Sequence, residues 1–316
     1  MSLISFLEFI EIKTKLASMI PFILGTLYSL YRYKSFNLKN FIIMGISLLT
    51  FDMATTAINN YIDYKKDLKC NGHNHENKNA IVRYNIKEST AVAIIFTLLA
   101  IAIFFGILLT LNTNVVVLLI GIISFLAGIF YTYGPIPISR MPLGEVFSGV
   151  FMGFIILFLA CYIHISDKNI ISIMYVSNML NISINLAELF YIFLISIPTI
   201  NGIANIMLAN NICDLEEDIT NKRYTLPYYL GKGNALTLFK ALYYIAYLDI
   251  IILAILKISP VSSLLVILTI IPLNKNIKLF HQKPIKSETF ILSVKNFALM
   301  NVTHIILVLI ALIFNW

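Results

Sequence analysis

The sequence predicts an all-α, polytopic membrane protein with nine transmembrane helices. The 316 residues are 59% hydrophobic and only 12% charged, whereas a soluble globular chain carries about 25% charged residues. The mean hydropathy is +0.86, and the apolar residues form long runs separated by short polar segments. Disorder, a coiled coil and a secreted disulfide scaffold are excluded by the same composition. We expect one transmembrane domain over residues 1–316.

The apolar runs follow one another along the chain, most of them near the length of about 20 residues that crosses the hydrocarbon core. Leu and Ile fill them without the two-residue alternation of a transmembrane barrel, so we expect helices, which satisfy their own backbone in lipid. The outer segments between them, of which the longest lies near 165–186, are expected to be connectors. The runs cover roughly residues 16–33, 41–62, 88–111, 115–134, 143–164, 187–211, 235–256, 259–273 and 289–314.

The distribution of basic residues predicts the orientation. With a cytoplasmic N-terminus, 18 of the 23 Lys and Arg residues lie in inner segments and 5 in outer segments. The positive-inside rule favours this arrangement. We therefore expect a multi-pass protein of the cell membrane with its C-terminus outside. The two longest inner polar segments are residues 63–87 and 213–234.

The net charge of +7 does not indicate nucleic-acid binding, because the basic residues lie in short loops and not on a soluble domain. Membrane lipid with anionic headgroups is the expected partner. Cys70, Cys161 and Cys213 lack any CxxC spacing and are expected to be free thiols. The N-terminus shows no cleavable signal-peptide pattern.

A polar motif occurs twice, each time at the inner end of an apolar run. Residues 59–67 read N-N-Y-I-D-Y-K-K-D and residues 210–218 read N-N-I-C-D-L-E-E-D. Both copies fit N-N-x-x-D-x-x-x-D, with every matching position offset by 151 residues. This offset predicts an internal repeat of a four-helix unit, spans one to four and five to eight, with a ninth helix added. Repeat interfaces commonly hold the site in membrane proteins.

The spacing of the motif suits a divalent cation. Residues i and i+4 lie on one face of a helix, so the two aspartates of each copy form a carboxylate pair. Mg²⁺ prefers such hard oxygen ligands and is completed by substrate phosphates. Asp52 lies on the same helix face, deeper in the membrane, where a buried acid usually faces a cavity. The alternative is that these are solvated helix-end side chains. The expected metal ligands are Asn59, Asp63, Asp67, Asn210, Asp214 and Asp218.

Basic residues follow both copies of the motif. Lys222 and Arg223 come soon after the second copy, and Lys65, Lys66 and Arg83 follow the first. Cationic groups beside a metal-bound diphosphate stabilise the charge that develops as it leaves. The alternative for each residue is a loop charge that only sets topology.

At these residues the chain resembles the UbiA superfamily of intramembrane prenyltransferases, with nine transmembrane helices and aspartate-rich motifs after helices two and six. Within it, the chain is most similar to the branch of 1,4-dihydroxy-2-naphthoate polyprenyltransferases of menaquinone synthesis. The resemblance spans essentially the whole chain. It is carried by both motifs, by K-T-K-L-A-S at 13–18, by N-K-R-Y-T-L-P at 221–227, and by Y-T-Y-G-P-I-P at 131–137 with L-G-E at 143–145.

The resemblance implies Mg²⁺-dependent transfer of a prenyl group from a polyprenyl diphosphate to an aromatic acceptor, here 1,4-dihydroxy-2-naphthoate to give demethylmenaquinol. Loss of diphosphate leaves an allylic cation, which Phe and Tyr rings can face. Catalysis is assigned to the four motif aspartates with Lys222 and Arg223. Substrate binding is assigned to Lys13, Asp52, Asn59, Asn60, Arg83, Asn210 and Asn211.

The chain departs from the family pattern at several positions. Asn60 replaces an aspartate, Cys213 replaces an arginine and Asn221 replaces a glycine. Residues 79–82 read N-A-I-V where relatives often have R-P-L-V, and Lys78 or Arg83 could supply the missing cation. Another aromatic acceptor therefore stays open as an alternative.

Two further classes are weighed against prenyl transfer. A secondary transporter also has repeats and intramembrane acids, but Pro21, Pro198 and Pro272 do not match at the 151-residue offset. A CDP-alcohol phosphotransferase would begin its aspartate motif with D-G-x-x-A-R, which is missing. The segment C-N-G-H-N-H-E at 70–76 has no diagnostic metal-ligand spacing and is expected to be a solvated loop.

Overall fold

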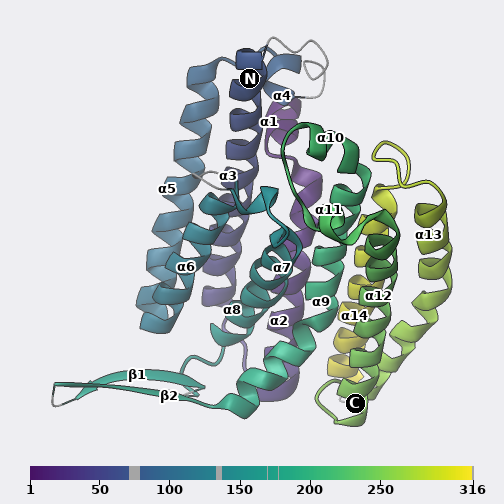
Figure 1. The fold of residues 1–316 in the computed structure, drawn as a ribbon. Coiled ribbons are helices and arrows are strands. Elements are labelled where there is room, and N and C mark those ends of the chain that lie inside the picture. Colours follow the sequence, from purple (N-terminus) through teal and green to yellow (C-terminus); the bar gives the residue numbers. More distant parts are fainter. Residues whose placement is uncertain (71–78, 133–136, 169, 177, 315–316) are drawn as a thin grey trace.

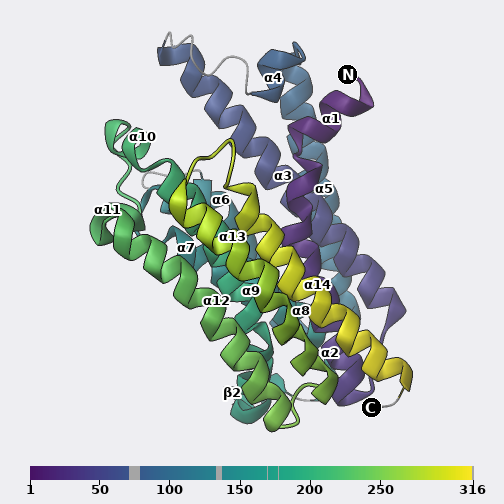
Figure 2. The same ribbon diagram turned by 90° about the vertical axis from the view of Figure 1, so that its right-hand side faces the viewer.

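The computed structural model describes residues 1–70, 79–132, 137–168, 170–176 and 178–314, without the side chains of 66–70, 132, 174 and 176. The fold is a bundle of long helices whose two chain ends lie at opposite ends of the bundle (Figures 1 and 2). The first half contains α1 (Leu3–Phe9), η1 (Ile12–Lys15), α2 (Leu16–Tyr33), α3 (Leu38–Cys70), α4 (Ala80–Arg83), α5 (Glu88–Asn112), α6 (Val115–Thr132) and η2 (Ile138–Arg140). The second half contains α7 (Gly144–Ser148), η3 (Gly149–Ile155), α8 (Ile156–Tyr162), β1 (Ile171–Val176), β2 (Met179–Ile184), α9 (Leu186–Cys213), α10 (Leu215–Thr220), α11 (Leu226–Leu230), α12 (Lys232–Ile255), η4 (Val261–Thr269), α13 (Ile270–Gln282) and α14 (Ile291–Phe314).

Each apolar run of the sequence coincides with a helical segment. Within the described residues, seven helices are long and apolar enough to cross a membrane. They are α3, α5, the segment from α7 to α8, α9, α12, the segment from η4 to α13, and α14. The apolar helix α6 is shorter, and α2 is not among the seven. The expected count of nine spans is therefore not confirmed, whereas the multi-pass helical architecture is.

Local capping explains where several helices begin. The side chain of Asn185 accepts a hydrogen bond from the backbone N–H of Glu188 (3.2 Å), which starts α9. Glu188 lies in the first turn, where a carboxylate complements the helix dipole. Asn79 caps α4 in the same way through the N–H of Ile81 (2.9 Å).

Glycines allow two helix pairs to approach closely. A Cβ atom at Gly25 on α2 would lie 2.3 Å from the carbonyl oxygen of Leu157 on α8. A Cβ atom at Gly153 on η3 would lie 2.6 Å from the backbone of Ile200 on α9. Small residues at such crossings let membrane helices gain van der Waals contact, the main attraction available to them in lipid.

The buried core has two main parts, one on each side of α9. One part joins α2, α8 and the end of α5 through side chains such as Leu24, Tyr28 and Leu157. The other joins α9, α12, α13 and α14 through side chains such as Phe239 and Phe280. A cavity is lined by residues of α2, α3, α5 and α6 together with residues of the following helices.

The segment near 165–186 is not the simple connector that was expected. It forms an antiparallel hairpin of β1 and β2, with Ile171 opposite Ile184 and Val176 opposite Met179. The hairpin projects sideways from the end of the bundle opposite the two motifs (Figure 1). The prediction of an all-α fold is therefore wrong for this segment. Figure 1 also shows that α3 ends, and α9 passes into α10, at the same end of the bundle, which we call the motif end.

Candidate active site

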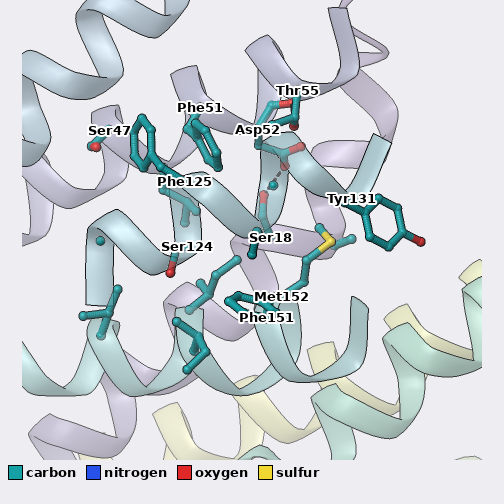
Figure 3. Close-up of a pocket in the computed structure, with 18 of the residues that line it drawn as sticks. Ser18, Ser47, Phe51, Asp52, Thr55, Ser124, Phe125, Tyr131, Phe151 and Met152 are labelled. Carbon is teal, nitrogen blue, oxygen red and sulfur yellow. Dashed lines mark hydrogen bonds between the residues drawn. The ribbon is translucent and has the colours of Figure 1, made fainter. Parts of the chain in front are cut away.

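A cavity of about 910 Å³ opens between α2, α3, α5, α6, the segment from α7 to α8, and α9. Aromatic side chains form much of its wall, including Phe51, Phe125, Phe151 and Tyr131 (Figure 3). The rings of Phe51 and Phe125 are stacked, with their centroids 4.0 Å apart. This lining suits a hydrocarbon chain and keeps water away from a reacting group.

One wall of the cavity consists of side chains that also reach the outer surface of the bundle. Ile103 and Ile107 on α5, and Leu118, Ile122 and Leu126 on α6, all line the cavity. Each of them is also an exposed hydrophobic side chain, 37–52% accessible. This exposed apolar wall suits contact with a hydrocarbon chain.

A polar network lies in this otherwise apolar space. The ammonium group of Lys15, a residue only 3% exposed, donates to the Asp52 carboxylate (2.7 Å), to the Asp52 carbonyl (3.0 Å) and to Thr56 Oγ1 (2.5 Å). Ser18 Oγ donates to the other carboxylate oxygen of Asp52 (2.6 Å). Asp52, Thr56 and Ser18 line the cavity, and Figure 3 shows Ser18 directed toward Asp52. Lys15 is the site residue that the sequence analysis missed here.

The first motif copy occupies the last turns of α3. Asn59 lines the cavity, and its Oδ1 atom is buried without a hydrogen-bond partner among the described residues. Asp63 follows four residues later, about 6 Å further along the helix, and is exposed. Asn60 points elsewhere, since its side-chain amide donates to the carbonyl of Phe9 (2.9 Å). Asp67 lies in α3 with its side chain outside the described residues.

The second copy follows the same pattern at the end of α9. Asn210 lines the same cavity as Asn59. Asn211 instead donates to Glu145 Oε1 (2.8 Å) in the buried contact between α9 and α7. Asp214 lies one turn beyond Asn210, between α9 and α10, and forms an ion pair with Lys286. Asp218 is buried on α10.

Asp218 is held by two neighbours on the loop that follows it. Thr225 Oγ1 lies 3.4 Å from one carboxylate oxygen, and Arg223 Nη1 lies 3.7 Å from the other. Burial raises the pKa of Asp218, and the positive charge of Arg223 acts against that rise. The carboxylate is therefore closer to protonation than a solvated aspartate.

The remaining predicted basic residues are less closely associated with the motifs. Lys222 is exposed beside Arg223. Arg83 forms an ion pair with Glu8 (3.1 Å) and Lys13 is exposed on η1. Lys286, on the loop before α14, was not singled out by the sequence analysis although it reaches Asp214. Lys66 and residues 71–78, which include Lys78, lie outside what the structure describes.

Among the described side chains, no group of three or more His, Cys, Asp or Glu residues is close enough to hold a metal. The described aspartates of the two motifs are thus not gathered into a single cluster. The side chain of Asp67 lies outside the described part of the chain. The unpartnered Asn59 oxygen at the cavity wall and the paired Asp214 and Asp218 carboxylates have the oxygen chemistry that Mg²⁺ prefers.

Comparisons with known proteins fit this architecture. The family model described as the UbiA prenyltransferase family matches residues 18–300. The chain is 32% identical over 238 residues to the 1,4-dihydroxy-2-naphthoate octaprenyltransferase of Bacillus subtilis (strain 168), covering 75% of this chain and 70% of that protein.

Two solved structures share the fold. A UbiA homolog from Aeropyrum pernix K1 has a TM-score of 0.67 at 21% identity, covering 93% of this chain and 98% of that chain. A UbiA homolog from Archaeoglobus fulgidus bound to DMAPP and Mg²⁺ has a TM-score of 0.60 at 13% identity, covering 97% and 99%. The resemblance inferred from the motifs is thereby confirmed: the chain belongs to the UbiA prenyltransferase family.

Proposed function

We propose that this prenyltransferase transfers a polyprenyl group from a polyprenyl diphosphate to 1,4-dihydroxy-2-naphthoate in a Mg²⁺-dependent reaction. The observation that carries the proposal is one large apolar cavity lined by Asn59 and Asn210, the first residues of the two motif copies. The hydrocarbon tail lies in the apolar part of the cavity, and the diphosphate lies toward the motif end. The naphthoate acceptor is supported by the activity named for the Bacillus subtilis relative.

The diphosphate is bound by oxygen ligands acting through Mg²⁺ and by cations of the chain. Asn59, Asp63, Asp67, Asn210, Asp214 and Asp218 would hold the metal, which neutralises and orients the diphosphate when bound. Lys222 and Arg223 lie on the loop after α10 and contact the diphosphate oxygens. Lys286 orients the Asp214 carboxylate through their ion pair.

The aromatic wall protects the reacting carbon. Departure of the diphosphate leaves an allylic cation, which water would capture in an open site. Phe51, Phe125, Phe151 and Tyr131 line the cavity, and their π faces attract a cation. The apolar side chains of α5 and α6 exclude water from the opposite wall.

The polar network at Asp52 orients the acceptor. All three donors of the Lys15 ammonium are used by Asp52 and Thr56, so the Asp52 carboxylate is fixed in the cavity with further lone pairs available. A ring hydroxyl of the acceptor donates to this carboxylate, which positions the nucleophilic ring carbon. For a hydroxynaphthoate, a new C–C bond forms at that carbon and the carboxyl group leaves as CO₂.

We also propose that the motif end faces the cytoplasm of the cell membrane, with the N-terminus inside and the C-terminus outside. The excess of basic residues in the segments assigned to that side supports this orientation. An impermeant amine reagent applied to intact cells should modify Lys257 and spare Lys222; the opposite labelling would reverse the topology.

Product analysis by mass spectrometry tests the function. The purified protein in lipid receives Mg²⁺, a mixture of prenyl diphosphates, and a panel of acceptors that includes 1,4-dihydroxy-2-naphthoate and 4-hydroxybenzoate. We expect a decarboxylated prenyl-naphthol that requires Mg²⁺ and is lost in Asp63→Ala and Asp214→Ala. Glu216→Ala, an exposed acid on α10, is the matched control and should keep activity.

Other products would redirect the proposal. A prenylated 4-hydroxybenzoate in place of the naphthol would keep prenyl transfer and overturn the naphthoate acceptor. No turnover of any acceptor by folded protein would contradict the catalytic proposal and favour a silent homologue or a transporter.

A further inference from the structure

The β1–β2 hairpin has one fully apolar face. Its register pairs Ile171 with Ile184, Ile173 with Ile182, and Tyr175 with Leu180. Because side chains alternate along a strand, these six residues lie on the same side. The other side is mixed: it carries Ser172 and Ser183, whose hydroxyls are hydrogen-bonded at 2.7 Å, and the pairs Met174–Asn181 and Val176–Met179.

The base of the hairpin fixes the direction of the apolar face. Ile171 and Ile173 pack against the buried core, and β1 contacts α6. The hydroxyl of Tyr162 donates to the carbonyl of Ile171 (3.0 Å) and accepts a hydrogen bond from the side chain of Asn114 (2.8 Å). The apolar face is therefore turned toward the helices, and the Ser172–Ser183 face is turned away from them.

The outer half of the same face has nothing to pack on in the described chain. Tyr175 is 71% exposed, Leu180 61% and Ile182 58%. A two-stranded hairpin is marginally stable by itself in water, and a contiguous exposed apolar patch commonly marks an interaction site. The hairpin thus lacks a partner for the half that projects beyond the bundle (Figure 1).

The surroundings of the hairpin indicate a lipid surface. Exposed hydrophobic side chains also lie on the helices next to it: Val115 and Leu118 on α6, which contacts β1, and Leu186 and Phe190 at the start of α9, which follows β2 in the chain. Those side chains belong to the surface that the spanning helices present to lipid. The hairpin also runs across the helices and not along them, at the level where they end (Figure 1).

The composition of the hairpin agrees with that partner. Residues 171–184, I-S-I-M-Y-V-S-N-M-L-N-I-S-I, contain no charged side chain. Association with lipid by apolar burial requires none, whereas recognition of a charged protein partner would use complementary charges. Tyr175 combines an apolar ring with a hydroxyl, the chemistry that is enriched at membrane–water interfaces.

We propose that the β1–β2 hairpin lies on the lipid surface at its own end of the bundle as an interfacial anchor, with Tyr175, Leu180 and Ile182 directed into the upper acyl region. Ser172, Asn181 and Ser183 then face water. This inference is independent of the substrate and of the proposed reaction, because the hairpin lies at the end of the bundle opposite the motifs.

A tryptophan probe tests the proposal, because the chain has a single native tryptophan, Trp316. In a Trp316→Phe background, Leu180→Trp and its neighbour Asn181→Trp place the probe on opposite faces of one strand. The proteins are reconstituted in phosphatidylcholine nanodiscs, with or without lipid brominated high on the acyl chains. Tyr175→Trp places a second probe on the apolar face, at the cross-strand partner of Leu180. Because it replaces one aromatic residue by another, it should disturb the hairpin least and serves as the control for folding.

We expect brominated lipid to quench Leu180→Trp and Tyr175→Trp several-fold more than Asn181→Trp. Acrylamide, a quencher in the aqueous phase, should show the reverse order. Equal access of acrylamide to all three probes would show a hairpin free in water and overturn the proposal. Protection of Leu180→Trp and Tyr175→Trp from both quenchers would overturn it in favour of a protein partner, such as a second copy pairing through the strand edge.

Discussion

Lys15 and Asp52 form an ion pair at 2.7 Å inside the bundle, with side chains only 4% and 14% exposed. The pair joins the end of η1, directly before α2, to the middle of α3. Ser18 Oγ donates to the second carboxylate oxygen, so the position of Asp52 depends on residues at the junction of η1 and α2. The polar group in the cavity is thus part of the fold as well as of the site.

The first prediction separates these two roles. Lys15→Met alone should destabilise the protein by about 3–5 kcal/mol, because it leaves the Asp52 charge without its partner. Lys15→Met with Asp52→Asn should recover much of that loss, since both charges are removed together. Thermal unfolding in a fixed detergent measures the change, with exposed Lys13→Met as the stability control.

Activity completes that comparison. If Asp52 positions the acceptor, the double variant should be folded and yet show a raised KM for the naphthoate, with the KM for the prenyl diphosphate little changed. A double variant with wild-type acceptor kinetics would restrict the pair to a structural role.

The second prediction assigns different roles to the two asparagines of each motif. Asn59 and Asn210 line the cavity, so replacing either by Ala should lower activity about 10–100-fold and raise the Mg²⁺ requirement, as loss of metal-site support does. Asn60 and Asn211 make packing hydrogen bonds, so their Ala variants should lose about 1–3 kcal/mol of stability. Paired activity and unfolding measurements on all four variants check the division; an equal effect of both members of a doublet on Mg²⁺ dependence would refute it.

The positions of the helices and of the two motifs could be predicted from the sequence, because hydropathy and helical spacing depend on residues close together in the chain. The run at 41–62 lies within α3, and both motifs end a helix at the same end of the bundle. Which asparagine of each doublet faces the cavity could not be predicted, since it depends on what packs beside it. Asn60 is turned away by a carbonyl 51 residues distant, and Asn211 by Glu145, 66 residues distant.

The roles of Lys286 and Lys15 could not be predicted for a similar reason. Lys286 reaches Asp214 across 72 residues of chain, and no local pattern links the two. Lys15 stands in a short basic stretch before the first apolar run, where a solvated loop charge is expected, although the fold buries it. The hairpin did leave a signal, because Ile171-Ser172-Ile173 alternates with the period of a strand. That signal is short and lies between strongly apolar helices.

The third prediction concerns acid pH. Burial raises the pKa of Asp218, and the charge of Arg223 opposes the rise. Arg223→Gln should therefore raise that pKa further. Because protons then compete with Mg²⁺ for the carboxylate at higher pH, the acid limb of kcat/KM should move to higher pH. Lys283→Gln, which removes an exposed charge paired with Glu288, serves as the comparison and should leave the acid limb in place. An acid limb that is also unchanged in Arg223→Gln would show that Arg223 does not control the pKa of Asp218.

The fourth prediction tests whether Lys286 positions the second motif. Lys286 and Lys283 lie on the same loop before α14, but Lys286 pairs with Asp214 and Lys283 pairs with Glu288 (2.7 Å). Both lysines are more than half exposed, so neither pair contributes much to stability. Lys286→Met should lower kcat/KM about 10–100-fold at fixed Mg²⁺, because the orientation of a metal-binding carboxylate is lost. Lys283→Met should leave it unchanged.

A positioning role predicts more than a loss of rate. If Lys286 acts through Asp214, then Lys286→Met by itself should raise the Mg²⁺ concentration needed for half-maximal activity. The same change should add little to the defect of Asp214→Asn, since the two changes remove one function. The unfolding temperature should stay within the range of the Lys283→Met control. Additive losses in the double variant would instead mean that Lys286 contacts the diphosphate independently of Asp214, because a residue acting only through a carboxylate has no effect once that carboxylate is gone.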